Sequence, residues 1–278
     1  MDLINPFVGG WKVVGSLEYG GMALELIGKI LSNDVGMLII SSIDHVAKDV
    51  TIRPRTADLI RASNCNAETS PDSKKDSYRV GDRRTLFSGA PYDPAKTGAK
   101  DVRFNRVPPG FRGTGKGSSA TIFFDADDGG CFDNHTEVSS QYDDILMHEL
   151  VHALRMAQGL MNYVPTRNHR YDNVEEFIAI VVTSVYISAK GSHRFRADHM
   201  GHRLLSQSLS TSAGFIHDDH NFQMLNRFRR DWREMFSALA RVQTSFNPFR
   251  EMIHYPPNAT SAVRKPNSTS AKHAGAAH

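Results

Sequence analysis

One short motif constrains this chain more than any other feature of its sequence. Residues 148–152 read His-Glu-Leu-Val-His, which is an H-E-x-x-H pattern. On a helix, residues four positions apart lie one turn above each other on the same face, so both imidazoles can reach one metal ion. Although the chain has 13 histidines, only about 0.02 such matches are expected by chance. The motif therefore predicts a helix that carries part of a metal site.

The residues around the motif predict an amphipathic, buried helix over 142–158. Apolar side chains flank the histidines at helical spacing, and Gly159 follows as a C-terminal cap. Glu149 projects from the same turn, where it can take a proton from a metal-bound water. We therefore assign His148 and His152 as zinc ligands and Glu149 as the catalytic base. The apolar flanks argue against the alternative of two surface histidines on an ordinary helix.

Zinc needs a third protein ligand. The positions where metzincins carry glycine and histidine hold arginine and glutamine here, which excludes that class. The alternative is a carboxylate from the next predicted helix, which begins near residue 173 and extends to about residue 190. Asp172 and Glu175 fit a capping pair, whereas Glu176 has no such role, so the sequence favours Glu176. Glu175 and Asp172 remain alternatives, as do histidines further along, at 169, 199 or 202.

The motif and the glutamate pair at the head of an apolar helix resemble the NleD-like effector zinc metallopeptidases of bacteria. That family is delivered by type III or type VI secretion and includes toxin domains fused to VgrG spike proteins. The resemblance spans about residues 20–205. It implies an α+β, zincin-like fold, in which a small N-terminal sheet packs on a mainly helical C-terminal part.

The same resemblance implies a zinc (Zn2+) endopeptidase that hydrolyses protein or peptide substrates. Glu149 would pass the proton of the attacking water to the leaving amine. The oxyanion needs a second donor besides zinc, and the candidate stabilisers are Tyr163, His169, Tyr171 and His199. An immunity protein or a component of the secretion apparatus would be the partner. The N-terminus shows no Sec-type signal peptide, and the expected place of action is the target cell, in the periplasm or the host cytoplasm.

The remaining sequence predicts one domain over 1–255, with sheet and loops in 1–140 and helices in 141–255. Residues 256–278 are poor in apolar side chains and predict a disordered tail. The strand expected over 119–124 either lines the substrate cleft or belongs to the core. Other expected elements are a strand at 49–53, a surface loop over most of 61–117, one helix or two over 22–43 with a break near Asn33, and helices at 199–209 and 221–242.

A second class of function remains open, a non-enzymatic helical interaction module or nucleic-acid-binding module whose histidines are incidental. A net charge of +3 is too small to indicate nucleic acid, and the basic stretch 227–233 reads as a solvated helix face. The glycine-rich stretch 110–117 lacks the final Ser/Thr of a P-loop. No apolar run reaches the length of a transmembrane segment. Cys65 and Cys131 can be either bonded or free.

Overall fold

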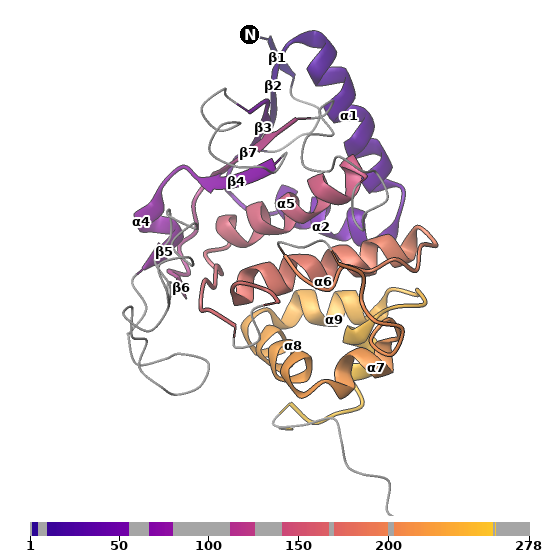
Figure 1. The fold of residues 1–278 in the computed structure, drawn as a ribbon. Helices are drawn as coiled ribbons and strands as arrows, with labels where there is room; N and C mark the ends of the chain where they lie inside the picture. The colour runs from indigo at the N-terminus through magenta and orange to yellow at the C-terminus, as the bar shows by residue number, and fades with distance from the viewer. Residues whose placement is uncertain are drawn as a thin grey trace, which may run out of the picture.

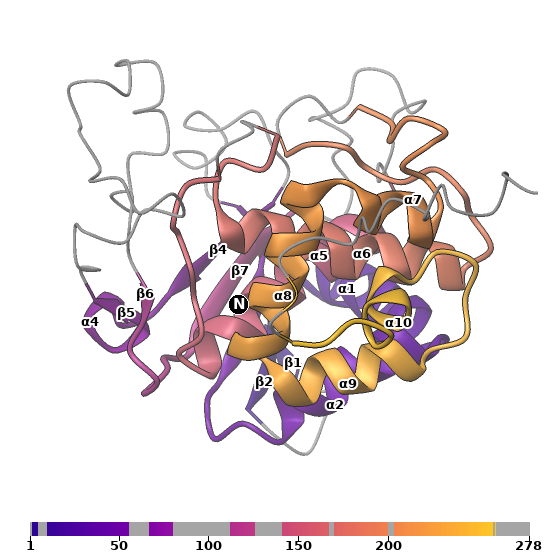
Figure 2. The ribbon, with the colours of Figure 1, turned by 90° about the horizontal axis from the view of Figure 1, so that it is seen from below.

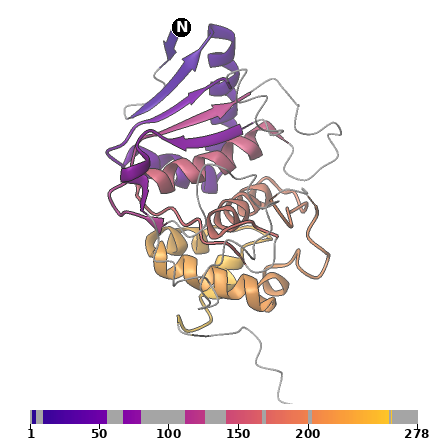
Figure 3. The same cartoon turned by 60° about the vertical axis from the view of Figure 1, so that its left-hand side comes forward.

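The structure is a computed structural model that describes residues 2–4, 10–55, 67–79, 112–125, 141–166, 170–199, 203–257 and 259. Within these residues the sheet lies in the N-terminal half and the helices dominate the C-terminal half. In Figures 1 and 3 the sheet, helix α5, helix α6 and the C-terminal helices follow one another as layers. The α+β class predicted from the sequence is confirmed.

The sheet has five strands in the order β1-β2-β3-β7-β4. Strands β2, β3 and β7 are parallel to one another, while the two outer strands pair antiparallel, β1 with β2 and β4 with β7. Alternate residues of the three central strands are fully buried, which places their apolar face against the helices. The bounds are Asp2–Ile4 (β1), Trp11–Gly15 (β2), Val50–Arg53 (β3), Ala67–Pro71 (β4) and Ala120–Phe124 (β7).

Four long helices pack beneath the sheet. They are α1 (Leu17–Leu31), α2 (Asp34–Asp44), α5 (Tyr142–Ala157) and α6 (Val174–Ala189). Helix α5 contacts β4 and β7 on one side and α6 on the other. It is therefore buried on all sides, in agreement with its predicted place in the core.

A second group of helices covers α6 from below (Figure 2). These are α7 (Ser212–His217), α8 (Asp219–Asp231), α9 (Arg233–Arg241) and α10 (Pro248–Met252). Aromatic rings fill the space between them, including Phe215, Phe228, Phe236, Phe246 and Phe249. The remaining elements are a short helix, α4 (Lys74–Ser77), and a small pair of strands, β5 (Tyr78–Arg79) and β6 (Arg112–Gly113). They lie next to β4, at the left of Figure 1.

The break that the sequence allowed near Asn33 is confirmed, whereas the single helix predicted over 221–242 is divided. The stretch 22–43 forms α1 and α2, because the Asn33 side chain accepts hydrogen bonds from the backbone of Val35 and Gly36, both 3.0 Å long, and starts a new helix. The stretch 221–242 is not one helix but α8 and α9. Trp232 interrupts it with φ −142° and ψ 57°, outside the helical region.

Two other expectations are wrong. The helix expected over 199–209 is absent among the described residues of that range, where Leu204 forms a bridge with Arg196 and a turn follows. The loop expected over 61–117 contains strand β4. Its sequence Ala-Glu-Thr-Ser-Pro has no apolar alternation, so its place in the sheet comes from backbone pairing with β7.

Most of the predicted disordered tail lies outside the described residues, although the backbone oxygen of Ala259 accepts a 2.8 Å hydrogen bond from Asn226. Cys65 and Cys131 also lie outside them. Among the described helices, none is long and apolar enough by itself to cross a membrane. Helices α1 and α2 pass that test only as a pair, with a 115° bend between them.

Candidate metal centre

Helix α5 carries the motif residues into the interior of the molecule. His148, Glu149 and His152 are all buried, and the two residues between them, Leu150 and Val151, are apolar and fully buried. The helix ends at Ala157, and Gly159, two residues later, adopts φ 68°. This agrees with the predicted position of the motif on a buried helix.

Close backbone packing fixes the C-terminal end of α5. A Cβ atom at Gly117 would lie 1.8 Å from the backbone oxygen of Ala157, and Gly117 has φ 73°. The backbone nitrogen of Gly115 donates to the oxygen of Gly159 at 3.0 Å, and that of Ser118 donates to Met156 at 3.1 Å. The glycine-rich stretch that resembled a P-loop is here a seam, residues 113–118, that packs against the end of the motif helix.

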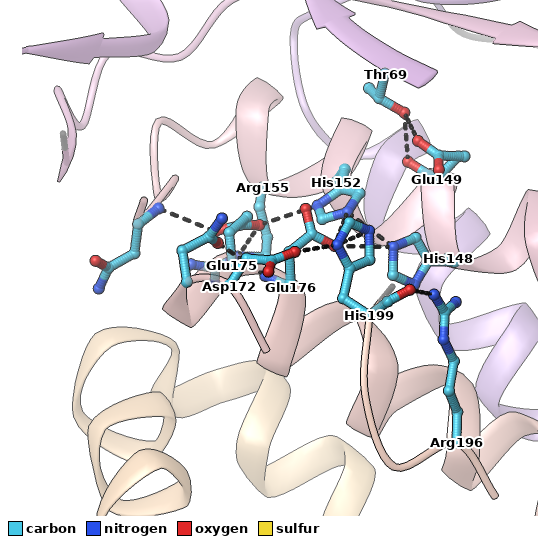
Figure 4. Close-up of polar contacts among 12 residues, drawn as sticks. Thr69, His148, Glu149, His152, Arg155, Asp172, Glu175, Glu176, Arg196 and His199 are labelled. Carbon is cyan, nitrogen blue, oxygen red and sulfur yellow. Dashed lines mark hydrogen bonds and ion pairs between the residues drawn. The ribbon is translucent and has the colours of Figure 1, made fainter. Parts of the chain in front are cut away.

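Helix α6 brings a carboxylate to the two histidines. The Asn173 side chain caps α6 by accepting a 3.0 Å hydrogen bond from the backbone nitrogen of Glu176. This corrects the prediction that Asp172 and Glu175 form a capping pair. The Asp172 carboxylate instead accepts a hydrogen bond from His199. The Glu176 side chain is directed at the motif helix (Figure 4).

Four polar atoms converge at this point. The Glu176 Oε2 atom lies 3.2 Å from His148 Nε2 and 3.4 Å from His152 Nε2. The two imidazole Nε2 atoms are 3.1 Å apart. The fourth atom is His199 Nε2, 3.2 Å from the same Glu176 oxygen. The cluster of His148, His152, Glu176 and His199 thus gathers three imidazole nitrogens around one carboxylate oxygen.

The arrangement can hold a metal ion. Ligand atoms of His148, Glu176 and His199 all lie within 4.8 Å of one another. Four ligands about 2.0–2.1 Å from one ion in a tetrahedron are separated from each other by about 3.3 Å. Four of the six separations in such a tetrahedron are given by the three contacts of Glu176 Oε2 with the imidazoles and by the His148–His152 contact. At 3.1–3.4 Å they are close to that edge length. Imidazole and carboxylate are also common ligand types for divalent metal ions.

The four side chains of the cluster differ in the charge that they favour. Burial lowers the pKa of His148 to about 3, because no water solvates its charged form. Burial opposes the charge of Glu176, but the neighbouring His199 and His152 outweigh it and hold the pKa of this carboxyl well below its usual range. Burial also opposes the charge of His152 and His199, but Glu176 outweighs it and raises the pKa of both imidazoles. The ionised Glu176 and the neutral His148 suit a metal ion, which would displace the protons from the other two imidazoles.

Glu149 lies beside the cluster and faces a different partner. Burial raises the pKa of the Glu149 carboxyl. The hydroxyl of Thr69, on strand β4, donates a 2.6 Å hydrogen bond to Glu149 Oε2 and lies 3.2 Å from the Glu149 backbone oxygen. Figure 4 shows this pair apart from the histidines. The Glu149 carboxylate is therefore oriented by β4, one of the two edge strands of the sheet.

Glu175, next to Glu176 in sequence, belongs to a separate buried network. It accepts a 2.7 Å hydrogen bond from Arg155 Nε and a 2.9 Å bond from the backbone nitrogen of Asn162. Its Oε1 atom lies 3.5 Å from His152 Nδ1. Arg155 is fully buried and also stacks over Trp232, 5.0 Å from the ring centroid. Glu175 thus lies behind His152 at ion-pair distance, without a hydrogen bond to its Nδ1 atom, and does not cap α6.

The residues predicted as oxyanion stabilisers lie in different surroundings. His199 joins the cluster. Tyr171 is fully buried, and its ring packs edge-on against Phe177 at 5.0 Å, so it is a core residue. Tyr163 is half-buried and packs against the core, and His169 lies outside the described residues. Strand β7 pairs with β3 and β4 on its two sides, so it is a core strand without a side for substrate.

Two contributions to the site were missed in the sequence. Thr69 lies in a polar stretch with no strand signal, so nothing pointed to its meeting with Glu149 across 80 residues. Arg155 did carry a signal, since a lone arginine in an apolar helix needs a buried partner. Comparisons of the chain with family models, curated proteins and solved structures found no significant match.

Proposed function

We propose that this protein is a zinc-dependent peptidase that hydrolyses peptide bonds. The observation that carries the proposal is the convergence of His148, His152 and Glu176 at 3.1–3.4 Å, with Glu149 on the same helix turn. Nitrogen and oxygen ligands at tetrahedral spacing suit zinc. When bound, zinc supplies Lewis-acid chemistry, which polarises a carbonyl and makes water more acidic.

The chain's own residues would divide the remaining work. Glu149 accepts a proton from the attacking water and delivers it to the leaving amine. Thr69 holds one Glu149 oxygen through its 2.6 Å hydrogen bond, which leaves the other oxygen for the proton. The Arg155–Glu175 pair orients His152 from behind.

Strand β4 is where we propose that an extended substrate lies. It is the terminal strand of the sheet, paired with β7 on one side, and its Thr69 contacts Glu149. A peptide that adds a strand to a sheet gains main-chain hydrogen bonds without requiring a particular sequence. Strand β4 takes the place of β7 as the proposed substrate-binding strand. From the sequence, β7 could equally have lined the cleft or belonged to the core.

By its resemblance to NleD-like effectors, we further propose that the protein is delivered into a target cell by a type III or type VI secretion system. A target-cell protein would then be the substrate. A cognate immunity protein would be a partner if rival bacteria are the targets.

The experiment compares the wild type with Glu149→Gln. Both purified proteins are analysed for zinc and incubated with a proteome-derived peptide library, and mass spectrometry counts new peptide N-termini. We expect one zinc per chain in both and new termini only with the wild type, since removal of general acid–base catalysis costs about 10²–10⁴-fold in rate. His148→Ala, which lacks a ligand, serves as the metal-free control.

The same variants can be expressed in the cytoplasm and the periplasm of a test bacterium, with growth as the readout. Growth arrest by the wild type alone would support the effector proposal. A wild type without zinc would contradict the proposed function and favour the non-enzymatic alternative. A Glu149→Gln variant that cleaves normally would contradict the assignment of Glu149 as the catalytic base.

A further inference from the structure

His199 differs from the other members of the cluster in its origin. His148 and His152 come from α5 and Glu176 from α6, whereas His199 lies in the non-helical segment that follows α6. Its Nε2 atom nevertheless lies 3.2 Å from Glu176 Oε2, the same separation as that of His148 Nε2. The His148 and His199 rings are almost parallel, with 6° between their planes.

The other ring nitrogen of His199 is also arranged as in a metal ligand. The Asp172 carboxylate accepts a hydrogen bond from His199 Nδ1. With Nδ1 donating to Asp172, Nε2 is the ring nitrogen that faces Glu176 and is placed to bind an ion. A carboxylate behind a histidine is the usual outer partner of a metal-bound imidazole, because it orients the ring and increases its basicity.

The backbone around His199 is held as well. Its nitrogen donates a 2.9 Å hydrogen bond to the oxygen of Arg170, which is close in sequence to Asp172. The Arg196 guanidinium donates to the backbone oxygen of Asp198 at 2.7 Å and to that of His199 itself. The imidazole is therefore placed by three independent anchors, two on its backbone and one on its ring.

We propose that His199 is a fourth protein ligand of the metal, so that the resting site consists of His148, His152, Glu176 and His199. The inference rests on the proposed zinc function and deepens it. A zinc ion with four protein ligands has no open position, so a substrate must add to the shell or replace a ligand. His199 is the ligand most accessible to replacement, since its side chain is 21% exposed, against 9% for His148 and 8% for His152.

X-ray absorption at the zinc edge of the full-length protein tests this directly, because it counts bound imidazoles. We expect three imidazoles in the wild type and two in His199→Ala. His193→Ala removes an exposed histidine six residues away and is the matched control, with three expected. In Asp172→Asn, competition with a chelator should show zinc affinity reduced by about 10–100-fold.

The wild-type count decides the inference even if a variant fails to fold. Two imidazoles in a zinc-loaded wild type would overturn it and favour His199 as an oxyanion stabiliser, while the proposed peptidase would stand. A wild type that binds no zinc would instead remove the proposed function, and the fourth ligand with it.

Discussion

Glu175 and Glu176 are neighbours on α6 with opposite surroundings. Glu176 faces three imidazoles, while Glu175 is fully buried against Arg155 and the backbone of Asn162. A charged group buried with its partner is costly to disturb, since removal of one member of such a pair typically costs about 3–5 kcal/mol. Substitution of Glu176 should therefore affect mainly metal binding, and substitution of Glu175 should affect mainly the stability of the fold.

We expect Glu176→Gln to lose zinc while it keeps its fold, because the amide is a poorer ligand than the carboxylate. Glu175→Gln should retain zinc, with affinity lowered by about 10–100-fold through the weakened support of His152. It should also lower the free energy of unfolding by about 3 kcal/mol. Metal analysis and urea denaturation of the two variants side by side test this. Zinc lost only from Glu175→Gln would reverse the assignment.

Thr69 offers a second comparison at the scale of single residues. Thr69→Val keeps the shape of the side chain but removes the hydroxyl that holds Glu149. A hydrogen bond to a charged group is worth about 1.5–3 kcal/mol, so hydrolysis of a cleaved library peptide should fall by roughly 10–100-fold in kcat. Zinc content should stay unchanged, while the melting temperature should fall by several degrees, because the buried Glu149 oxygen loses its hydrogen-bond partner. Thr69→Ser restores the hydroxyl and should recover activity, and equal losses in both variants would argue for a packing role.

At the scale of elements, one ion cluster joins the start of α5 to the end of α6. The Lys190 ammonium contacts Asp143 and Asp144, each at 2.6 Å, and Tyr186 donates a 2.7 Å hydrogen bond to Asp143. Burial raises the pKa of Asp144 from 3.8 to about 6. These contacts fix how the two helices that supply the metal ligands lie against each other.

The raised pKa predicts a specific pH dependence. The folded state holds the Asp144 proton more tightly than the unfolded chain, so the stability contributed by this group is fully present below pH 4 and is lost as pH rises through 6. The loss amounts to about 2–3 kcal/mol. Asp144→Asn cannot titrate, so its free energy of unfolding should fall less over this interval than that of the wild type. Parallel curves from denaturation at pH 4.5 and pH 7 would contradict the prediction.

The elements that carry the motif could be predicted from sequence because their signals are local. Helices α5 and α6 follow from apolar periodicity around His148 and after Asn173, and the capping of α2 by Asn33 marks a break that the sequence already indicated. Strand β4 could not be predicted, since the strand that it pairs with, β7, lies about 50 residues away and its own residues are polar. Trp232 divides α8 from α9 through tertiary packing, while the apolar stripe continues across it.

At the scale of the whole molecule, the metal would connect three separate parts of the chain. Its proposed ligands come from α5, from α6 and from the segment that ends at His199. The sequence located the first two and named His199 only as one of several donors. The reason is that a loop carries no periodicity from which its position can be inferred. Asp172 is the residue that places it, through a contact over 27 positions.

Zinc should consequently stabilise the folded chain as a whole. A ligand that binds only the folded state adds about 4 kcal/mol at a thousandfold excess over its Kd, and each kcal/mol raises the melting temperature of a domain of this size by roughly 2–4 °C. Removal of zinc by EDTA should therefore lower the Tm of the wild type by roughly 10 °C. His148→Ala should melt at the same temperature with and without EDTA, and a similar shift in both proteins would point to a different effect of the chelator.

The seam between residues 113–118 and the end of α5 has a consequence for surveys of mutational tolerance. Gly117 admits no side chain, because a Cβ there would collide with the backbone of Ala157, whereas Gly115 has a similar φ of 77° and open space around its Cβ position. In a saturation mutagenesis screen, position 117 would rank as intolerant as His148 or Glu176, and position 115 would not. Intolerance to substitution would therefore not distinguish Gly117, which makes a backbone contact, from the proposed metal ligands. A measurement of bound metal would separate the two groups.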